Sequence, residues 1–134
     1  MPLVVRIAVL VCTASLLAAC QSATGAAGDG TLRVRATRDS LRIENRSDAP
    51  VFVAAFGVET LPLIDWYTCL DVDRCPPVPA GGVRSVARPT TVELKPEREA
   101  VVYWWRSVPA AAPVPPNRSL ARPDSVRELR VRFP

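Results

Sequence analysis

The sequence predicts an all-β domain in which seven or eight short strands form two antiparallel sheets packed face to face. Fourteen of the 134 residues are proline, and each proline breaks a helix interior and removes a backbone donor. Apolar and polar residues alternate in several short runs, which is the period of half-buried strands. Clusters of turn-forming residues separate the runs. The alternative architecture is a small open β-barrel.

Each predicted strand is recognised by alternation or by a continuous apolar run. Residues 32–36 and 41–44 alternate and are joined by a short turn, whereas residues 51–56 are apolar on both faces, as expected of a central strand. Further strands are predicted at residues 62–68, 83–87, 91–95, 100–106 and 126–133.

Two segments of the chain resemble immunoglobulin-like domains. "LRIENRSDAPVFV" contains a strand, an Asn-containing turn and an apolar strand, and "VELKPEREAVVYWW" contains a strand, a Pro-Glu turn and an aromatic strand. The resemblance implies an immunoglobulin-like antiparallel β-sandwich of the kind common in bacterial surface proteins. Both segments are generic, so they indicate a fold and no particular activity.

The first nineteen residues have the pattern of a secretory signal peptide. One positive charge at Arg6 precedes an almost wholly apolar run from Ile7 to Leu17, and small residues follow. The run is shorter than the ~20 apolar residues that a membrane-spanning helix requires. We therefore expect residues 1–19 to be a removable export signal.

The end of this segment, Leu17-Ala18-Ala19-Cys20, resembles the lipobox of bacterial lipoproteins. In that family the cysteine thiol receives diacylglycerol, the signal is cut just before the cysteine, and the new amino group is usually acylated. The resemblance implies that Cys20 is the lipid attachment site and that the membrane is a partner through the acyl chains. Each buried methylene contributes about 0.8 kcal/mol, so two or three chains give nearly permanent attachment.

Residue 21 and the composition bear on location. Gln21 stands where an aspartate would retain a lipoprotein of diderm bacteria in the inner membrane, so the resemblance implies the outer membrane facing the periplasm, with the cell surface as alternative. Residues 20–30 are small and polar and predict a lipidated cysteine with a flexible tether. Residues 31–134 then form the sandwich domain. The sequence contains no basic cluster with interleaved aromatic residues, so we expect no nucleic-acid partner.

Cys69 and Cys75 are the cysteines that remain in the predicted domain. In an exported protein they most simply form a disulfide, which would fix one local loop. Asp65, Asp71 and Asp73 lie in or beside this loop and could present oxygens to Ca²⁺. The alternative is a solvated acidic loop, and Arg74 opposes cation binding. We expect no metal or cofactor.

Trp104 and Trp105 are neighbours on a predicted strand and must point to opposite faces. The sequence does not decide which of them is buried in the core. The outward tryptophan, for which we consider Trp104, is either covered by a loop, with the proline segment as the expected cover, or exposed as a partner surface.

The connection from residue 107 to residue 124 is longer than most loops in compact domains. Its prolines, including Pro113, Pro115 and Pro116, favour an extended conformation. The connection is either a binding loop that extends the partner surface or a plain surface excursion.

The absence of histidine excludes several kinds of enzyme. Ser-His-Asp and Cys-His catalysis both require an imidazole. We therefore predict a membrane-anchored envelope lipoprotein that is not an enzyme and that acts as an interaction or structural module for an unknown envelope protein or ligand. The alternatives are a proteinase-inhibitor-like or ligand-capturing domain and, behind these, a histidine-free hydrolase.

Overall fold

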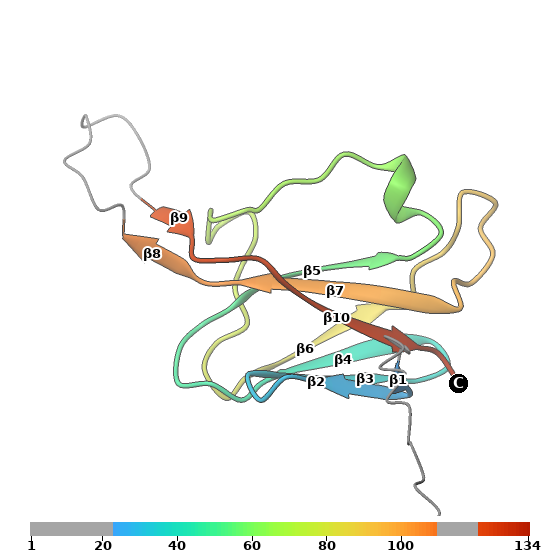
Figure 1. Cartoon of the computed structure of the whole chain (residues 1–134), viewed down its shortest axis with the longest axis horizontal. Coiled ribbons are helices and arrows are strands. Elements are labelled where there is room, and N and C mark those ends of the chain that lie inside the picture. The colour runs from blue at the N-terminus through green and yellow to red at the C-terminus, as the bar shows by residue number, and fades with distance from the viewer. Residues whose placement is uncertain (1–22, 110–120) are drawn as a thin grey trace, which may run out of the picture.

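The computed structural model describes residues 23–109 and 121–134 (Figure 1). These residues form ten strands and one short 3-10 helix, and they include no helix long and apolar enough to cross a membrane. The elements are β1 (Ala23–Thr24), β2 (Ala26–Gly28), β3 (Leu32–Ala36), β4 (Ser40–Asn45), β5 (Phe52–Gly57), η1 (Leu61–Leu63), β6 (Val83–Ala87), β7 (Glu99–Trp105), β8 (Ser107–Pro109), β9 (Ala121–Pro123) and β10 (Arg127–Arg132).

The fold is a β-sandwich, as predicted, and it does not close into a barrel. One sheet has the strand order β1-β10-β7-β5 and the other has the order β2-β3-β4-β6. Neighbouring strands are antiparallel except for β1, which runs parallel to β10. The hairpin β8–β9 is a separate two-stranded ribbon that projects from one end of the molecule (Figure 1).

The route of the chain from β3 onward follows that of immunoglobulin-like domains, as predicted. In a constant-type domain the first two strands pair in one sheet, and the chain crosses to the other sheet between the second and third strands. Here β3 and β4 pair within one sheet, and the chain crosses between β4 and β5. The strand orders β3-β4-β6 and β5-β7-β10 correspond to A-B-E and C-F-G of that fold.

The core lies between the sheets and is built from the apolar side of each alternating strand. Burial alternates along β3 and β4 as predicted, and full burial of a side chain of this size contributes about 1.5–3 kcal/mol. The core residues are Leu32, Val34, Ala36, Leu41, Ile43, Val51, Val78, Ala100, Val102, Trp104, Val131 and Phe133.

Two of the predicted strands are absent. Residues 62–68 contain the end of η1 followed by extended chain without sheet pairing. Pro62 lies in the first turn of this helix, where it needs no backbone donor. Residues 91–95 form a turn in which the Thr91 N–H donates to the Lys95 oxygen. Leu94 adopts a φ of 61° there, a left-handed conformation that no strand contains.

The predicted flexible tether is also corrected over its described part, residues 23–30. β1 pairs with β10 and β2 pairs with β3, so residues 23–28, which precede the predicted domain start at Thr31, belong to the sandwich. Gly25 stands between the two short strands with a φ of +76°. Its N–H donates to the Arg132 oxygen in one sheet, and its oxygen accepts from the Ala36 N–H in the other.

Candidate functional site

Several of the predicted site residues lie outside the described part of the chain. They are the lipid attachment site Cys20 and three prolines of the long connection, Pro113, Pro115 and Pro116. The connection is shorter than predicted, because its ends pair as β8 and β9 with Ser107 opposite Pro123. Residues 110–120 therefore follow a regular hairpin stem.

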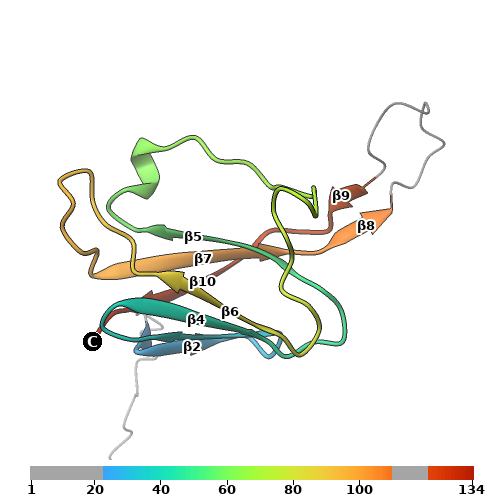
Figure 2. The ribbon, with the colours of Figure 1, turned by 180° about the vertical axis from the view of Figure 1, so that it is seen from behind.

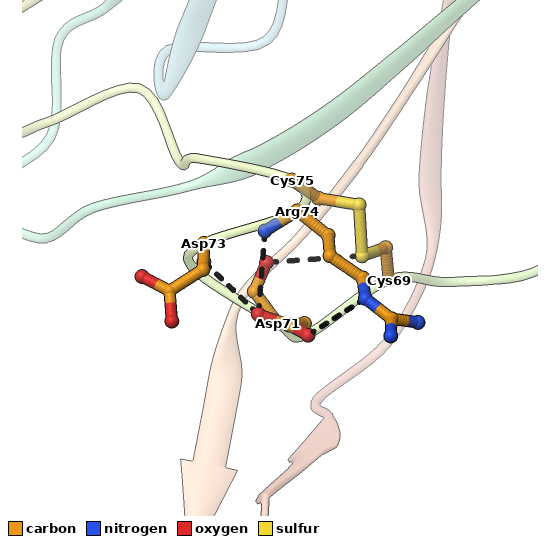
Figure 3. A network of polar contacts seen from close by, with 5 residues as sticks. All are labelled: Cys69, Asp71, Asp73, Arg74 and Cys75. Carbon is orange, nitrogen blue, oxygen red and sulfur yellow. Dashed lines mark hydrogen bonds and ion pairs between the residues drawn. A yellow bond between two sulfur atoms is a disulfide. The ribbon is translucent and has the colours of Figure 1, made fainter.

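The predicted disulfide between Cys69 and Cys75 is present (Figure 3). The Cys75 N–H donates to the main-chain oxygen of Asp71 at 2.7 Å. The Asp71 carboxylate accepts hydrogen bonds from the N–H groups of Asp73 and Arg74, at 3.0 and 3.3 Å. It also forms an ion pair with the Arg74 side chain at 3.4 Å. Asp71 thus holds the turn that the disulfide closes.

The calcium site considered as a candidate at Asp65, Asp71 and Asp73 is not formed among the described residues. Among residues 23–109 and 121–134, no three acidic or cysteine side chains converge as metal ligands. The physical reason is the role of Asp71, whose oxygens bind the turn's own N–H groups and the Arg74 cation. The side chain of Asp73 points away from Asp71 (Figure 3).

Trp104 lies in the sandwich core, so the partner surface predicted at this residue is wrong. Its side chain is 2% exposed, and its Nε1 donates a hydrogen bond to the Asp29 carboxylate at 2.8 Å. The guanidinium of Arg127 lies 4.5 Å from the ring centre, within the range of a cation–π contact. The indole therefore has partners on its edge and its face.

Trp105 points to the opposite face of β7 and is also 2% exposed. Its cover is residues 58–76, hereafter the covering loop, which arches over the outer side of β5 and β7 (Figures 1 and 2). Trp66 of this loop stacks on Tyr103 with ring centres 4.5 Å apart. The Trp105 Nε1 donates to the Cys69 oxygen at 3.0 Å. A loop thus covers the outward tryptophan. Among the described residues, the loop's contacts to Trp105 come from the Trp66 indole and the Cys69 main-chain oxygen, whereas the proline segment was the expected cover.

Five aromatic rings, four from the strands and one from the covering loop itself, form a second apolar layer on the outer face of the β5–β7 sheet. Successive side chains of a strand point to opposite faces. Because β5 and β7 are apolar on both faces, one set of side chains enters the core and the other set forms this outer layer. The sequence analysis placed Trp66 in a predicted strand and therefore missed its role in covering the sheet. The pair of neighbouring aromatic residues Trp66 and Tyr67 was the feature of the sequence that could have drawn attention to this segment. The five rings are Phe52, Phe56, Trp66, Tyr103 and Trp105.

The covering loop presents apolar side chains to the solvent on its outer side. Tyr67 is 84% exposed, and Leu63 and Val72 are also well exposed. Trp66 and the disulfide hold the backbone on either side of Tyr67. The loop therefore displays an aromatic side chain from a fixed backbone, which is the arrangement that Tyr commonly has in protein interfaces.

A pocket of about 560 Å³ opens at the end of the sandwich where the C-terminal residues lie. Glu97 borders it and is only 1% exposed. Its carboxylate accepts hydrogen bonds from the Glu59 and Thr60 N–H groups, at 3.2 and 2.9 Å, and from the Thr60 hydroxyl at 2.7 Å. Glu97 thus holds the start of the covering loop. No sequence pattern indicated this contact.

Arg88 borders the same pocket and has structural partners. Its Nε donates to the main-chain oxygen of Glu97 at 2.8 Å, and a terminal nitrogen donates to that of Arg38 at 2.9 Å. The guanidinium also lies 4.4 Å from the ring centre of Phe133. The polar groups in this pocket therefore join loops to the sandwich.

Asp124 is an acidic residue with a shifted pKa. Burial by itself would raise the pKa of Asp124, but hydrogen bonds from the Arg106 and Ser125 N–H groups and the nearby Arg127 guanidinium outweigh it and lower the pKa below its ordinary value. The Arg106 N–H lies 2.8 Å from the carboxylate. Asp124 thus fixes the base of the β8–β9 hairpin as an anion.

Comparisons of the chain with protein-family models, with curated proteins and with solved structures find no match.

Proposed function

We propose that the protein is an envelope lipoprotein, anchored through Cys20, whose sandwich is a non-catalytic interaction or structural module. The observation that carries the proposal is the sequence Leu17-Ala18-Ala19-Cys20 after an apolar export signal, followed almost at once by a folded domain. Within the part of the chain that the structure describes, strand pairing starts at Ala23.

The short spacing supports a position close to the membrane surface. Three residue steps join Cys20 to Ala23, and a fully extended chain spans at most about 11 Å over that length. Acyl chains on Cys20 would therefore hold the sandwich beside the lipid headgroups. Gln21 favours the outer membrane facing the periplasm, with the cell surface as the alternative.

The chemistry of the chain supports a non-catalytic role. It contains no histidine, so no imidazole can activate a hydroxyl or thiol nucleophile. The buried carboxylate of Glu97, a natural candidate for acid–base chemistry, accepts three hydrogen bonds from its own fold. These bonds occupy the oxygens that a substrate would need.

The covering loop is the surface that we assign to a protein partner, in place of Trp104. Tyr67 offers a large ring at low entropic cost because the backbone beside it is already fixed by Trp66 and the disulfide. Leu63 and Val72 are further exposed apolar side chains of the same loop.

Labelling of Cys20 tests the anchor. In cells that express the full chain and are fed radiolabelled palmitate, the wild type should be labelled and should fractionate with the outer membrane. Cys20→Ser should be unlabelled and released in soluble form. Cys12→Ser is the matched control, because this cysteine lies inside the export signal and should leave labelling intact. Equal labelling of the Cys20→Ser chain would overturn the proposal.

Crosslinking in intact cells tests the module. A partner that binds the covering loop should be crosslinked to the wild type and recovered at least ten-fold less with Tyr67→Ser, because loss of an interface aromatic residue commonly costs more than 1–2 kcal/mol. Val126→Ser is the control, since Val126 is another exposed apolar residue. Recovery of the same partners in equal amounts by all three chains contradicts this assignment of the surface.

A further inference from the structure

The outer face of the β2-β3-β4-β6 sheet carries arginines in its centre and small residues at its edges. The strand register places Arg35 opposite Arg42 and Arg33 opposite Glu44, with all four side chains on the same face. Two cross-strand rows result, which are Ala26-Arg35-Arg42-Ser85 and Gly28-Arg33-Glu44-Val83. We call Arg33, Arg35 and Arg42 the arginine face.

The arginines of this face lack partners within the described chain. Like charges directly opposite one another destabilise a sheet, and Arg35 and Arg42 are such a pair. Neither of them, nor Arg33, forms an ion pair or side-chain hydrogen bond within residues 23–109 and 121–134. Glu44, the one acid in the two rows, pairs instead with Arg46 at 3.2 Å. Three guanidinium groups therefore remain available to an anion.

The shape of the face suits a flat partner. The residues that flank the arginines on β2 and β6 are Ala26, Gly28, Ser85 and Val83, all of them short. Arg35 and Arg42 are exposed, and Arg33 is half-buried. The covering loop lies on the other side of the sandwich (Figures 1 and 2), so the aromatic surface and the arginine face point in opposite directions.

The anchor would bring this face to the membrane. Ala26 is the end residue of one of the two rows, and it lies six residues after Cys20. An extended chain of that length spans at most about 22 Å, less than the diameter of a domain with a radius of gyration near 13 Å. The edge of the arginine face therefore stays within one domain diameter of the lipidated residue.

We propose that the arginine face docks on the phosphate headgroups of anionic phospholipids beside the anchor. The position of the arginine face beside a membrane rests on the proposed lipidation of Cys20. Arginine binds phosphate oxygens through a planar fork of donors, and a bilayer offers many phosphates in one plane. Three guanidinium groups on one sheet face, without ion-pair partners among the described residues, suit such a plane of phosphates. Docking would turn the covering loop away from the membrane, toward a partner.

Vesicle binding by the secreted chain, residues 20–134 with Cys20→Ser, tests the proposal without the acyl chains. We expect sedimentation with vesicles of phosphatidylcholine and phosphatidylglycerol, no sedimentation with phosphatidylcholine alone, and weaker binding as sodium chloride is raised. Each arginine removed should weaken the partition coefficient about five-fold, so Arg35→Gln/Arg42→Gln should weaken it about 25-fold. Equal binding to both vesicle types, or to neither, overturns the proposal.

Two controls separate docking from general charge and from misfolding. Arg74→Gln/Arg130→Gln removes the same charge from ion pairs elsewhere and should keep near-wild-type binding; an equal loss would assign the effect to net charge and overturn the proposal. The Arg35→Gln/Arg42→Gln variant should resist urea at least as well as the wild type, because a repulsive pair is removed. Its unfolding would overturn the account of the arginine face.

Inorganic phosphate distinguishes a lipid surface from a site for a free anion. Without vesicles, titration of the chain with inorganic phosphate should show no saturable binding at millimolar concentration, because one ion cannot engage the three guanidinium groups together as a plane of headgroups does. Saturable phosphate binding that Arg35→Gln/Arg42→Gln abolishes would assign the face to a free anion and overturn docking on lipid. Because the tested chain carries no acyl group, failure here leaves the palmitate labelling of Cys20 intact, and failure of the labelling leaves this binding measurement intact.

Discussion

The carboxylate of Asp29 accepts a hydrogen bond from the indole Nε1 of Trp104 at 2.8 Å, across 75 positions of the chain. The same carboxylate accepts from the Thr31 and Leu32 N–H groups, at 3.0 and 2.9 Å. A residue that the composition placed in a flexible tether thus satisfies the polar edge of a core tryptophan. The N-terminal segment is part of the fold, and the sandwich depends on it.

We expect Asp29→Ala to lower the free energy of unfolding by about 1–3 kcal/mol, because a buried indole N–H loses its acceptor. Urea unfolding followed by tryptophan fluorescence measures the change. Asp48→Ala is the control, since Asp48 is exposed and its side chain forms no hydrogen bond or ion pair within residues 23–109 and 121–134, and it should change stability by less than about 0.5 kcal/mol. Equal stability of the two variants contradicts the role of Asp29.

We expect Cys69→Ser/Cys75→Ser to keep the sandwich and to lose about 2 kcal/mol of stability. The disulfide closes a short loop, and the chain-entropy model gives a modest effect for that length. Neither cysteine belongs to the core between the sheets. Far-ultraviolet circular dichroism should be unchanged while the urea midpoint falls; global unfolding at room temperature would show that the disulfide supports more than the covering loop.

We expect Gly57→Ala to destabilise the domain by about 1–3 kcal/mol, as overpacking usually does. A Cβ at residue 57 would overlap the buried side chain of Glu97, which its hydrogen bonds hold in place. The effect should shrink in the Glu97→Ala background, and a double-mutant cycle from urea unfolding measures the coupling. Additive effects of the two substitutions would exclude this contact as the cause.

We expect Asp124→Asn to remove a pH-dependent part of the stability. The folded pKa of Asp124 lies below its unfolded value of about 3.9, so its contribution is fully present above that value and is lost as the pH falls through the folded pKa. The stability difference between wild type and variant should therefore be largest near neutral pH and should narrow in acid. Urea midpoints across this range test the sign; a difference that widens in acid contradicts it.

Alternation predicted the buried faces of β3, β4 and β10 because each of these strands has one solvent face and one core face. It failed at residues 62–68 and 91–95, where short runs of apolar residues serve a loop and a turn. The positive φ of Leu94 depends on the geometry of its hairpin and carries no compositional signal. Local pattern therefore identified the sheets better than the connections.

The candidate site was predictable where the chemistry is local. Two cysteines near each other in a chain with the pattern of an export signal indicated the disulfide. The depth of Trp104 and Trp105, in contrast, depended on what covers each face of β7. Period two places the two indoles on opposite faces but cannot show that both faces are buried. β1 and β2 were missed because backbone pairing needs no apolar side chain, and the small residues around Gly25 provide none.

The crossing at Gly25 has a mechanical consequence for a chain held by its N-terminal end. Its N–H and its oxygen bond to different sheets, through Arg132 and Ala36, and β1 and β2 continue that division on either side. A pull on a lipid at Cys20 would first load β1 along β10 and then reach β2 through this residue. Tension would thus be shared between the two sheets. The segment from β1 to β2, which bonds to both sheets, would resist their separation.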